Sequence, residues 1–342
     1  MNPMTLAARL SRRATLALVL SAPAVLPRMA RGQGAGIAQL LDAAASHEQL
    51  RAIAVWRDGA EIAARGYRGF TPDRPTNIKS ASKSVISALA GIAIAKGVLK
   101  GTGQRLVELL PAADLPGSPD PRMGQVTLGH LLSMQAGLTR QSGPNYGAWV
   151  GSRNWVRAAL SAGFEDRPGG RMLYSTASTH LVSAVLTRAA GRSTLALARD
   201  WLGGIEGFEI TAWQRDPQGI YLGGNEMAMT TRSLLAFGAA YAAGGAGVIP
   251  ASWIENSWQP RTNSIFSGEA YGYGWFIGRT DGLFGRPVRY GWGYGGQMIY
   301  CFPPYRGQGA MAVAMTSDPD RPSAASGYRT ALHRLAAGIA AG

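Results

Sequence analysis

Strand-like patterns lie at both ends of this chain, and this arrangement constrains its fold more than any other feature. Near the N-terminus, residues 51–69 alternate on both sides of Asp58-Gly59, a dipeptide typical of a two-residue β-hairpin turn. Near the C-terminus, residues 271–279, 287–303 and 309–318 look like three further strands. Because helical patterns fill the residues between, we predict one sheet made from both termini with a helical insertion in the middle.

Helical patterns account for most of the rest. A chain of 342 residues can bury a large core, as one large domain or two closely packed ones. No repeat, long linker or low-complexity tract interrupts it. Helices are predicted over residues 37–50, 80–97, 106–110, 126–138, 154–162, a segment ending at Gly191, and residues 193–202, 229–243, 250–258 and 324–341.

The segment 76–100, TNIKSASKSVISALAGIAIAKGVLK, carries the strongest chemical signal. Its apolar residues recur at helical spacing, and Ser80 and Lys83 lie three positions apart, so a helix places both on one face. A serine hydroxyl becomes a good nucleophile when a neighbouring base takes its proton, and a lysine becomes that base when burial lowers its pKa. Free N–H groups at a helix N-terminus also suit a developing oxyanion.

Chance is the alternative explanation, because a Ser-x-x-Lys spacing arises about once in every few hundred residues. The chain has 34 lysines and arginines, of which only four are lysines, all within residues 79–100. Lys83 alone among them has a serine three positions before it. A surface rich in arginine makes a lysine on an apolar helix face harder to explain as a solvated charge, which favours a catalytic pair.

Further candidates come from three other segments. Tyr174 follows a Pro-Gly-Gly turn and precedes a helix, so its phenol can project into a cleft, although a half-buried loop aromatic is the plainer interpretation. Glycines inside the strand-like WGYGGQMIY (292–300) indicate close approach of a backbone or ligand, or a bulge. His130 is a candidate base, but a histidine in an apolar helix is more often structural, and we favour that interpretation.

Charge and composition exclude several other functions. The formal net charge is +14, but five of the arginines lie in the acid-free N-terminal segment and the rest are scattered, so we expect a solvated basic surface and no nucleic-acid partner. Cys301 is the only cysteine, which excludes an intrachain disulfide. The four histidines lack metal-binding spacing, and no G-x-S-x-G elbow or phosphate loop is present. We therefore expect neither metal nor cofactor.

The N-terminal segment 1–34 resembles an export signal. A charged stretch is followed by a short apolar run and small residues, and Ser11-Arg12-Arg13 before Leu16 fits a twin-arginine signal. The apolar run is too short for a membrane span and is interrupted by Pro23. We expect a mature domain over residues 35–342, periplasmic or secreted; an arginine-rich amphipathic leader or a retained anchor is the alternative.

Taken together, the motifs resemble the serine β-lactamase and penicillin-binding-protein superfamily. The likeness is to its class C-like branch, which holds esterases, D-amino-acid peptidases and 6-aminohexanoate-dimer hydrolases as well as β-lactamases. The S-x-x-K motif matches residues 80–83, Y-x-N matches residues 174–176, and the K-T-G motif or a variant of it matches residues 294–296. The resemblance spans about residues 48–318, and three motifs in order make it specific.

This resemblance implies a fold and a set of roles. The fold is α/β (α+β) and β-lactamase/transpeptidase-like, with an antiparallel sheet subdomain over about residues 35–79 and 265–342 and a helical subdomain over about 80–264. Ser80 is the implied nucleophile, Lys83 its partner, and Tyr174 acts as base and then as acid. The implied oxyanion hole uses the N–H groups of Ser80 and Gln297. The implied substrate contacts are Thr176, Tyr294, Gly295 and Gly296.

Two departures from the family pattern bear on the substrate. Thr176 stands where β-lactamases have an asparagine that contacts the substrate amide. Tyr294 stands where β-lactamases and cell-wall peptidases have a cationic residue that helps to hold the substrate carboxylate. The loss of that cation favours an ester or a simple amide as substrate. Pocket shape depends on the loops at 140–155, 204–226 and 260–270.

Three functions remain open at this point. The first is an exported serine hydrolase that acts on a small ester or amide through an acyl-enzyme. The second is a β-lactamase or a D-alanyl-D-alanine carboxypeptidase type of enzyme. The third, from another class, is a non-catalytic binding protein that keeps the fold without efficient turnover. The sequence predicts no oligomeric state.

Overall fold

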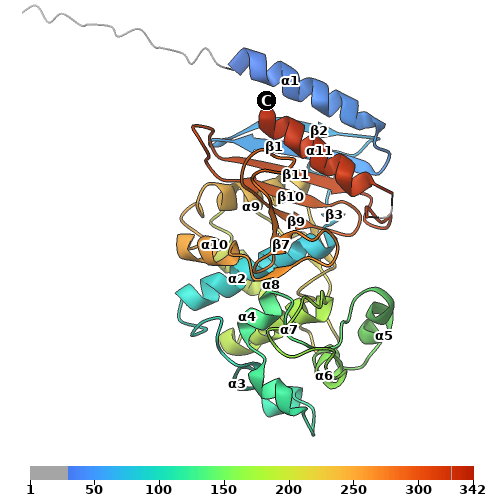
Figure 1. The fold of residues 1–342 in the computed structure, drawn as a ribbon, viewed down its shortest axis with the longest axis vertical. Coiled ribbons are helices and arrows are strands. Elements are labelled where there is room, and N and C mark those ends of the chain that lie inside the picture. The colour runs from blue at the N-terminus through green and yellow to red at the C-terminus, as the bar shows by residue number, and fades with distance from the viewer. Residues whose placement is uncertain (1–29, 325) are drawn as a thin grey trace, which may run out of the picture.

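The two ends of the chain meet in one eight-stranded sheet at the centre of the molecule (Figure 1). The structure is a computed structural model that describes residues 30–324 and 326–342. The strand order is β2-β1-β11-β10-β9-β8-β7-β6, and every neighbouring pair is antiparallel. The predicted mixed fold, an antiparallel sheet from both termini flanked by helices, is confirmed.

The sheet has a seven-residue strand at one edge, long strands in the middle, and three short strands of two or three residues towards the other edge. Its strands are β1 (Leu50–Arg57), β2 (Ala60–Gly66), β6 (Thr262–Asn263), β7 (Ala270–Tyr271), β8 (Phe276–Gly278), β9 (Val288–Trp292), β10 (Met298–Phe302) and β11 (Met311–Ser317). A small second sheet, which the sequence did not predict, has the order β3-β5-β4 and consists of β3 (Thr76–Asn77), β4 (Ala212–Trp213) and β5 (Met227–Met229).

Helices cover both faces of the large sheet. They are α1 (Ala30–Ala43), α2 (Ser82–Ala95), α3 (Leu106–Leu109), α4 (Leu128–Leu132), α5 (Tyr146–Val150), α6 (Trp155–Ser161), α7 (Thr176–Ala190), α8 (Thr194–Trp201), α9 (Thr231–Ala242), α10 (Ala251–Ser257) and α11 (Tyr328–Ala341). Helices α1 and α11 lie together on one face, whereas α9 and α2 lie on the other side, and α3 to α7 form the part furthest from the sheet (Figure 1).

Alternation along the strands supplies one core to each face. On β10, Met298, Tyr300 and Phe302 belong to the buried cluster under α1 and α11, whereas Ile299 and Cys301 belong to the cluster around α9. Contact with α9 is close at Gly238, where an added Cβ would lie 2.7 Å from Ile299 Cγ2. The sheet therefore forms the shared wall between two cores.

Several local predictions are confirmed and several are wrong. Asp58 and Gly59 have φ values of 44° and 103°, as a two-residue hairpin turn requires. The helix predicted over residues 126–138 is reduced to α4, because Met134 adopts φ 63° and cannot continue it. The helix predicted from residue 37 begins earlier, at Ala30, and that predicted from residue 324 begins at Tyr328.

The most consequential correction concerns residues 287–303, which were predicted as one strand. They form two, β9 and β10, joined by a tight turn over residues 293–297. The Gly296 N–H donates to the Gly293 carbonyl across 2.9 Å, and the Gly293 N–H to the Gln297 carbonyl across 2.7 Å. The glycines are thus turn residues, and Gly296 adopts φ 96°.

Residues 1–29, which contain most of the predicted export signal, lie outside the described residues. In the described part of the chain, no helix has both the length and the apolar character needed to cross a membrane. The boundary between a sheet subdomain and a helical subdomain stays a prediction.

Candidate active site

The hydroxyl of Ser80 and the amine of Lys83 are in contact. Ser80 lies in a single 3-10 turn, η2 (Lys79–Ala81), that leads directly into α2, and Lys83 is the second residue of that helix. The Lys83 Nζ lies 3.0 Å from Ser80 Oγ and 2.7 Å from the carbonyl oxygen of Gly224. The helical turn brings the pair together as predicted, although Ser80 precedes the α-helix and is not part of it.

Burial changes the acid–base behaviour of this amine. Lys83 is 1% exposed, and the loss of solvation lowers its pKa to about 7. No carboxylate forms an ion pair with it in the described part of the chain. Near neutral pH a large fraction of the amine is therefore unprotonated, with its lone pair free to accept a proton from Ser80.

Tyr174 is next to this pair. The Lys83 Nζ lies over its ring, 5.1 Å from the centroid. Burial raises the pKa of Tyr174 to about 12, and a hydrogen bond with the Ser80 side chain acts in the opposite direction. Phe266 packs against the ring edge-on, with centroids 5.1 Å apart. The phenol is thus protonated at neutral pH and is held against Ser80.

Backbone strain occurs on both sides of this site. Lys79, immediately before Ser80, has φ 49°, and Glu226, two residues after Gly224, has φ 52°. Asn77 connects them: its Oδ1 accepts from the Lys79 N–H (2.9 Å) and its Nδ2 donates to Glu226 Oε2 (2.6 Å). Lys79 Nζ also lies 3.5 Å from Glu226 Oε1. One carboxylate therefore ties the turn that carries Ser80 to the loop that holds Lys83.

The turn between β9 and β10 supplies the third predicted segment. Its N–H groups at Gly293, Gly295 and Gly296 donate within the turn, that of Gly295 to the Gln297 side chain across 3.1 Å. Among the residues that the structure describes, the backbone N–H groups of Ser80 and Gln297 donate to no protein acceptor. These are the two donors that the family resemblance implicates.

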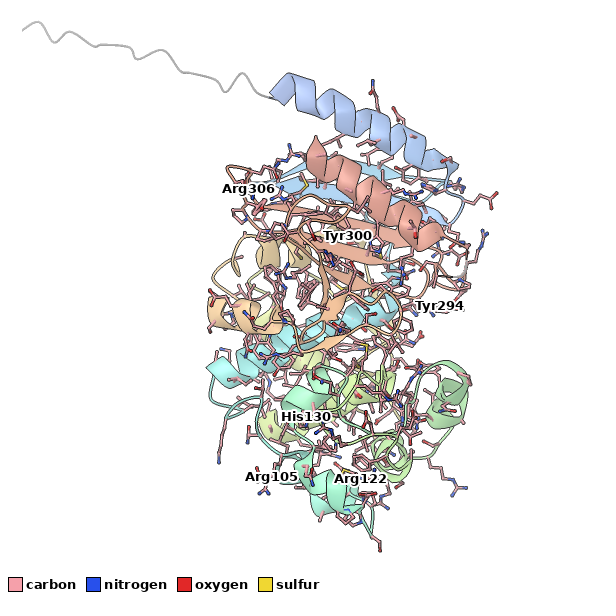
Figure 2. All side chains as sticks on the ribbon, viewed as in Figure 1. Arg105, Arg122, His130, Tyr294, Tyr300 and Arg306 are labelled. Atoms are coloured by element: carbon pink, nitrogen blue, oxygen red, sulfur yellow. The ribbon has the colours of Figure 1, made fainter. Side chains whose placement is uncertain are left out.

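A cavity of about 620 Å³ opens at this site. It is lined by Lys79, Ser80, Arg140, Ser142, Gly143, Tyr146, Tyr174, Thr176, Asn225, Glu226, Phe266 and Tyr294. Four of the predicted site residues therefore line the same cavity: Ser80, Tyr174, Thr176 and Tyr294. Figure 2 shows Tyr294 at the edge of the molecule, level with the C-terminal strands.

Other predicted residues are placed differently. An added Cβ at Gly295 would lie 2.0 Å from the Asp318 carbonyl, and one at Gly296 would meet Leu332 and Tyr328 at 2.9 Å, so both glycines pack against protein and neither lines the cavity. Thr176 lines it, but its hydroxyl lies 3.0 Å from Ser142 Oγ. The Thr176 hydroxyl is thus already hydrogen-bonded within the protein.

His130 has a structural role, as favoured above. Its backbone N–H donates to Thr127 Oγ1, and its Nδ1 accepts from the Thr127 N–H, a capping box at the start of α4. It does not line the cavity, and Figure 2 shows it among the helices of the insertion. No group of three or more metal-binding side chains occurs within the described ranges.

Residue-level reasoning missed Arg140, Tyr146, Asn225, Glu226 and Phe266. They come from the three loops that were expected to shape the pocket. A larger hollow of about 770 Å³ lies elsewhere, lined by residues within 268–289 and by Tyr305 and Arg306, and none of the predicted site residues lines it. We place the candidate active site at the smaller cavity because Ser80 and Tyr174 line it and the buried Lys83 amine contacts Ser80 behind its wall.

A sheet built from both termini, a helical insertion and a Ser-x-x-Lys pair between them define the class of β-lactamase-fold proteins. A family model described as Beta-lactamase matches residues 25–336, and the chain belongs to this family. No curated protein sequence matches the chain.

Solved structures share this fold at low sequence identity. A candidate 6-aminohexanoate-dimer hydrolase from Bacillus anthracis superposes with a TM-score of 0.70 at 17% identity, covering 89% of this chain and 81% of its own. EstCE1, described as a hydrolase with promiscuous acyltransferase activity, superposes with a TM-score of 0.72 at 19% sequence identity, and the match covers 91% of this chain and 99% of EstCE1. A penicillin-binding-protein homologue from Caulobacter crescentus superposes with a TM-score of 0.66 at 18% sequence identity, and the match covers 84% of this chain and 92% of the homologue. These likenesses show the fold.

Proposed function

We propose that the protein is an exported serine hydrolase that cleaves ester or amide bonds through an acyl-enzyme at Ser80. The observation that carries this proposal is the contact between the Ser80 hydroxyl and a buried amine without an acidic partner, at the wall of a cavity. A lysine that served only packing or surface charge would not need to be desolvated beside a hydroxyl.

The first proton transfer runs from Ser80 to Lys83. With its pKa near 7, Lys83 holds a lone pair at neutral pH, whereas the raised pKa of Tyr174 keeps the phenol protonated. The family resemblance gives Tyr174 the role of base first; burial of the phenol favours Lys83 for this step. As Ser80 Oγ bonds to the carbonyl carbon of the substrate, its proton passes to Lys83 Nζ.

The oxyanion that forms needs two donors, and the free N–H groups of Ser80 and Gln297 are suited to it. Tyr174 then gives its proton to the departing alcohol or amine, and Lys83 restores that proton, which leaves the acyl group on Ser80. A water molecule then attacks the acyl carbon and gives up one proton, which Ser80 Oγ takes as the Ser80–acyl bond breaks, so the acid is released and Ser80 is restored. The sum is the hydrolysis of one ester or amide bond.

Substrate preference follows from the cavity wall. Position 294 carries the phenol of a tyrosine that is 55% exposed. The turn between β9 and β10 therefore supplies no cation at this position to bind a substrate carboxylate. The Thr176 hydroxyl is engaged with Ser142. Both features favour esters and simple amides over penicillins.

Active-site labelling tests the proposal. A fluorophosphonate probe should label the purified protein, hydrolysis of 4-nitrophenyl butyrate should be measurable, and Ser80→Ala should abolish both. Ser82→Ala, two positions away, is the matched control and should still be labelled. Labelling that persists in Ser80→Ala would exclude this mechanism. Faster turnover of nitrocefin than of esters would favour a β-lactamase, and a folded protein without labelling or turnover would favour a binding protein.

Export rests on the segment 1–34 alone. We expect the full-length chain to reach the periplasm of a Gram-negative host, and Arg12→Lys with Arg13→Lys to retain it in the cytoplasm. Fractionation and immunoblotting measure this, and equal export of both forms would contradict a twin-arginine signal.

A further inference from the structure

The cavity that contains Ser80 has three charged side chains on its wall, Lys79, Arg140 and Glu226, and only one lacks a charge partner. Lys79 Nζ lies 3.5 Å from Glu226 Oε1 and 3.6 Å from Asp320 Oδ1. Glu226 also accepts a hydrogen bond from Asn77. Lys79 and Glu226 therefore largely neutralise each other.

Arg140 is different. Its Nε donates to the Tyr174 carbonyl across 3.3 Å. In the described part of the chain, its two terminal amino groups have no protein acceptor and no carboxylate forms an ion pair with the guanidinium. The exposed Glu165 accepts from the Arg140 backbone N–H at 2.9 Å and is held there. A guanidinium presents five N–H donors, and most of this fork remains available to the cavity.

The backbone around Arg140 is held in place. The Arg140 carbonyl accepts from Asn145 Nδ2 at 2.9 Å, and the Gln141 N–H donates to Ser175 Oγ at 3.0 Å. These contacts tie the loop to the segment that carries Tyr174. Because the side chain is also oriented by the Tyr174 carbonyl, little freedom remains to be lost when an anion binds.

We propose, on the basis of the hydrolase function above, that Arg140 is a specificity-determining residue that binds a carboxylate of the substrate. The guanidinium fork matches a carboxylate with two parallel hydrogen bonds. It replaces, from the loop after α4, the cation that is missing at position 294. The preferred substrates are esters or amides that carry a carboxylate at a distance from the bond that is cleaved.

The position of the fork sets that distance. Arg140 contacts the main chain of Tyr174, whereas the phenol of the same residue contacts Ser80, so roughly one tyrosine length separates the guanidinium from the hydroxyl. Phe266 and Tyr294, 42% and 55% exposed, add aromatic surface to the same cavity. A short apolar spacer between the carboxylate and the reacting carbonyl fits this arrangement.

Matched ester pairs test the inference. In the first pair, mono-4-nitrophenyl adipate, which carries its charge on the acyl side, is compared with its neutral methyl ester. In the second pair, 3-carboxyphenyl butyrate, which carries its charge on the leaving group, is compared with the neutral 3-acetylphenyl butyrate. The wild-type protein should prefer the charged member of at least one pair. Arg140→Gln should reduce that preference in kcat/KM by about ten- to a hundredfold, the loss expected for a charge-assisted hydrogen bond.

Two further variants sharpen the result. Arg140→Lys keeps the charge without the fork and should lose only part of the preference. Arg153→Gln removes an exposed arginine that does not line the cavity and should leave the preference as in the wild type. Equal preference in wild type and Arg140→Gln, or preference for the neutral member in both pairs, would overturn the inference.

A binding measurement separates this inference from the proposed function. In the Ser80→Ala background, calorimetry should show adipate binding that Arg140→Gln weakens at least tenfold. If no ester is hydrolysed but this difference is found, the hydrolase proposal fails and the anion site stands. If esters are hydrolysed through Ser80 but Arg140→Gln binds adipate as well as its parent, the anion site is wrong and the hydrolase stands.

Discussion

Replacing Lys83 with methionine should change how the stability of the protein depends on pH. Methionine preserves an unbranched apolar stem in the same buried space but cannot titrate. It also removes the hydrogen bonds to Ser80 and the Gly224 carbonyl, which costs about 1–3 kcal/mol at any pH. The pH-dependent part of the difference between the two proteins therefore reports the buried amine alone.

The sign follows from the direction of the shift. Burial lowers the folded-state pKa of Lys83 from 10.5 to about 7, so between these values the unfolded chain holds a proton that the folded protein lacks. The free energy of unfolding of the wild type then rises with pH in this window, by up to ~1.4 kcal/mol per pH unit. Between pH 7 and pH 9 the gain is about 2 kcal/mol. Below pH 7 both states are protonated and the contribution is constant.

Urea unfolding at 25 °C and pH 7, 8 and 9 measures this. We expect the stability of Lys83→Met relative to wild type to fall by about 2 kcal/mol between pH 7 and pH 9. Groups other than Lys83 titrate equally in both proteins and cancel. Lys96→Met, at the exposed end of the same helix, should show no such change. If the stability of Lys83→Met relative to wild type stays constant, or rises, between pH 7 and pH 9, a pKa near neutrality is refuted.

Three other predictions concern the same site. Tyr174→Phe should lower kcat for alkyl esters by about 10²- to 10⁴-fold. The loss should be smaller for 4-nitrophenyl esters, because their leaving group departs without a proton. Equal losses for both kinds of ester in steady-state assays would argue against Tyr174 as the acid. Glu226→Gln removes the ion pair with Lys79 and should lower kcat about tenfold. Its thermal unfolding midpoint should stay within a few degrees of wild type, because the ion pair is partly exposed. A lower midpoint with unchanged kcat would indicate that Glu226 has a structural role only. Gly224→Ala places a Cβ 2.3 Å from Thr179 Oγ1 and 3.0 Å from Lys83 Nζ, so it should reduce both activity and stability, the latter by about 1–3 kcal/mol. Gly103→Ala, which has open space around it, is the control, and calorimetric melting compares the two variants.

The amino-acid sequence determined the features that depend on neighbours along the chain. Hairpin geometry at Asp58-Gly59 follows from the conformations that these two residues tolerate. The contact between Ser80 and Lys83 follows from the spacing of one helical turn. The order of the motifs and the strand patterns at both ends were sufficient for the family and for the central sheet.

Long-range packing decided the rest. Lys83 is desolvated because other elements enclose it, and its second acceptor, the Gly224 carbonyl, lies 141 residues away along the chain. The left-handed conformation of Lys79 depends on Asn77 and on the distant Glu226. Arg140 reaches the cavity because its loop is held against the segment that carries Tyr174. Periodicity reports which face of an element is buried but not what covers it, so the charges and acceptors around the site required the tertiary structure.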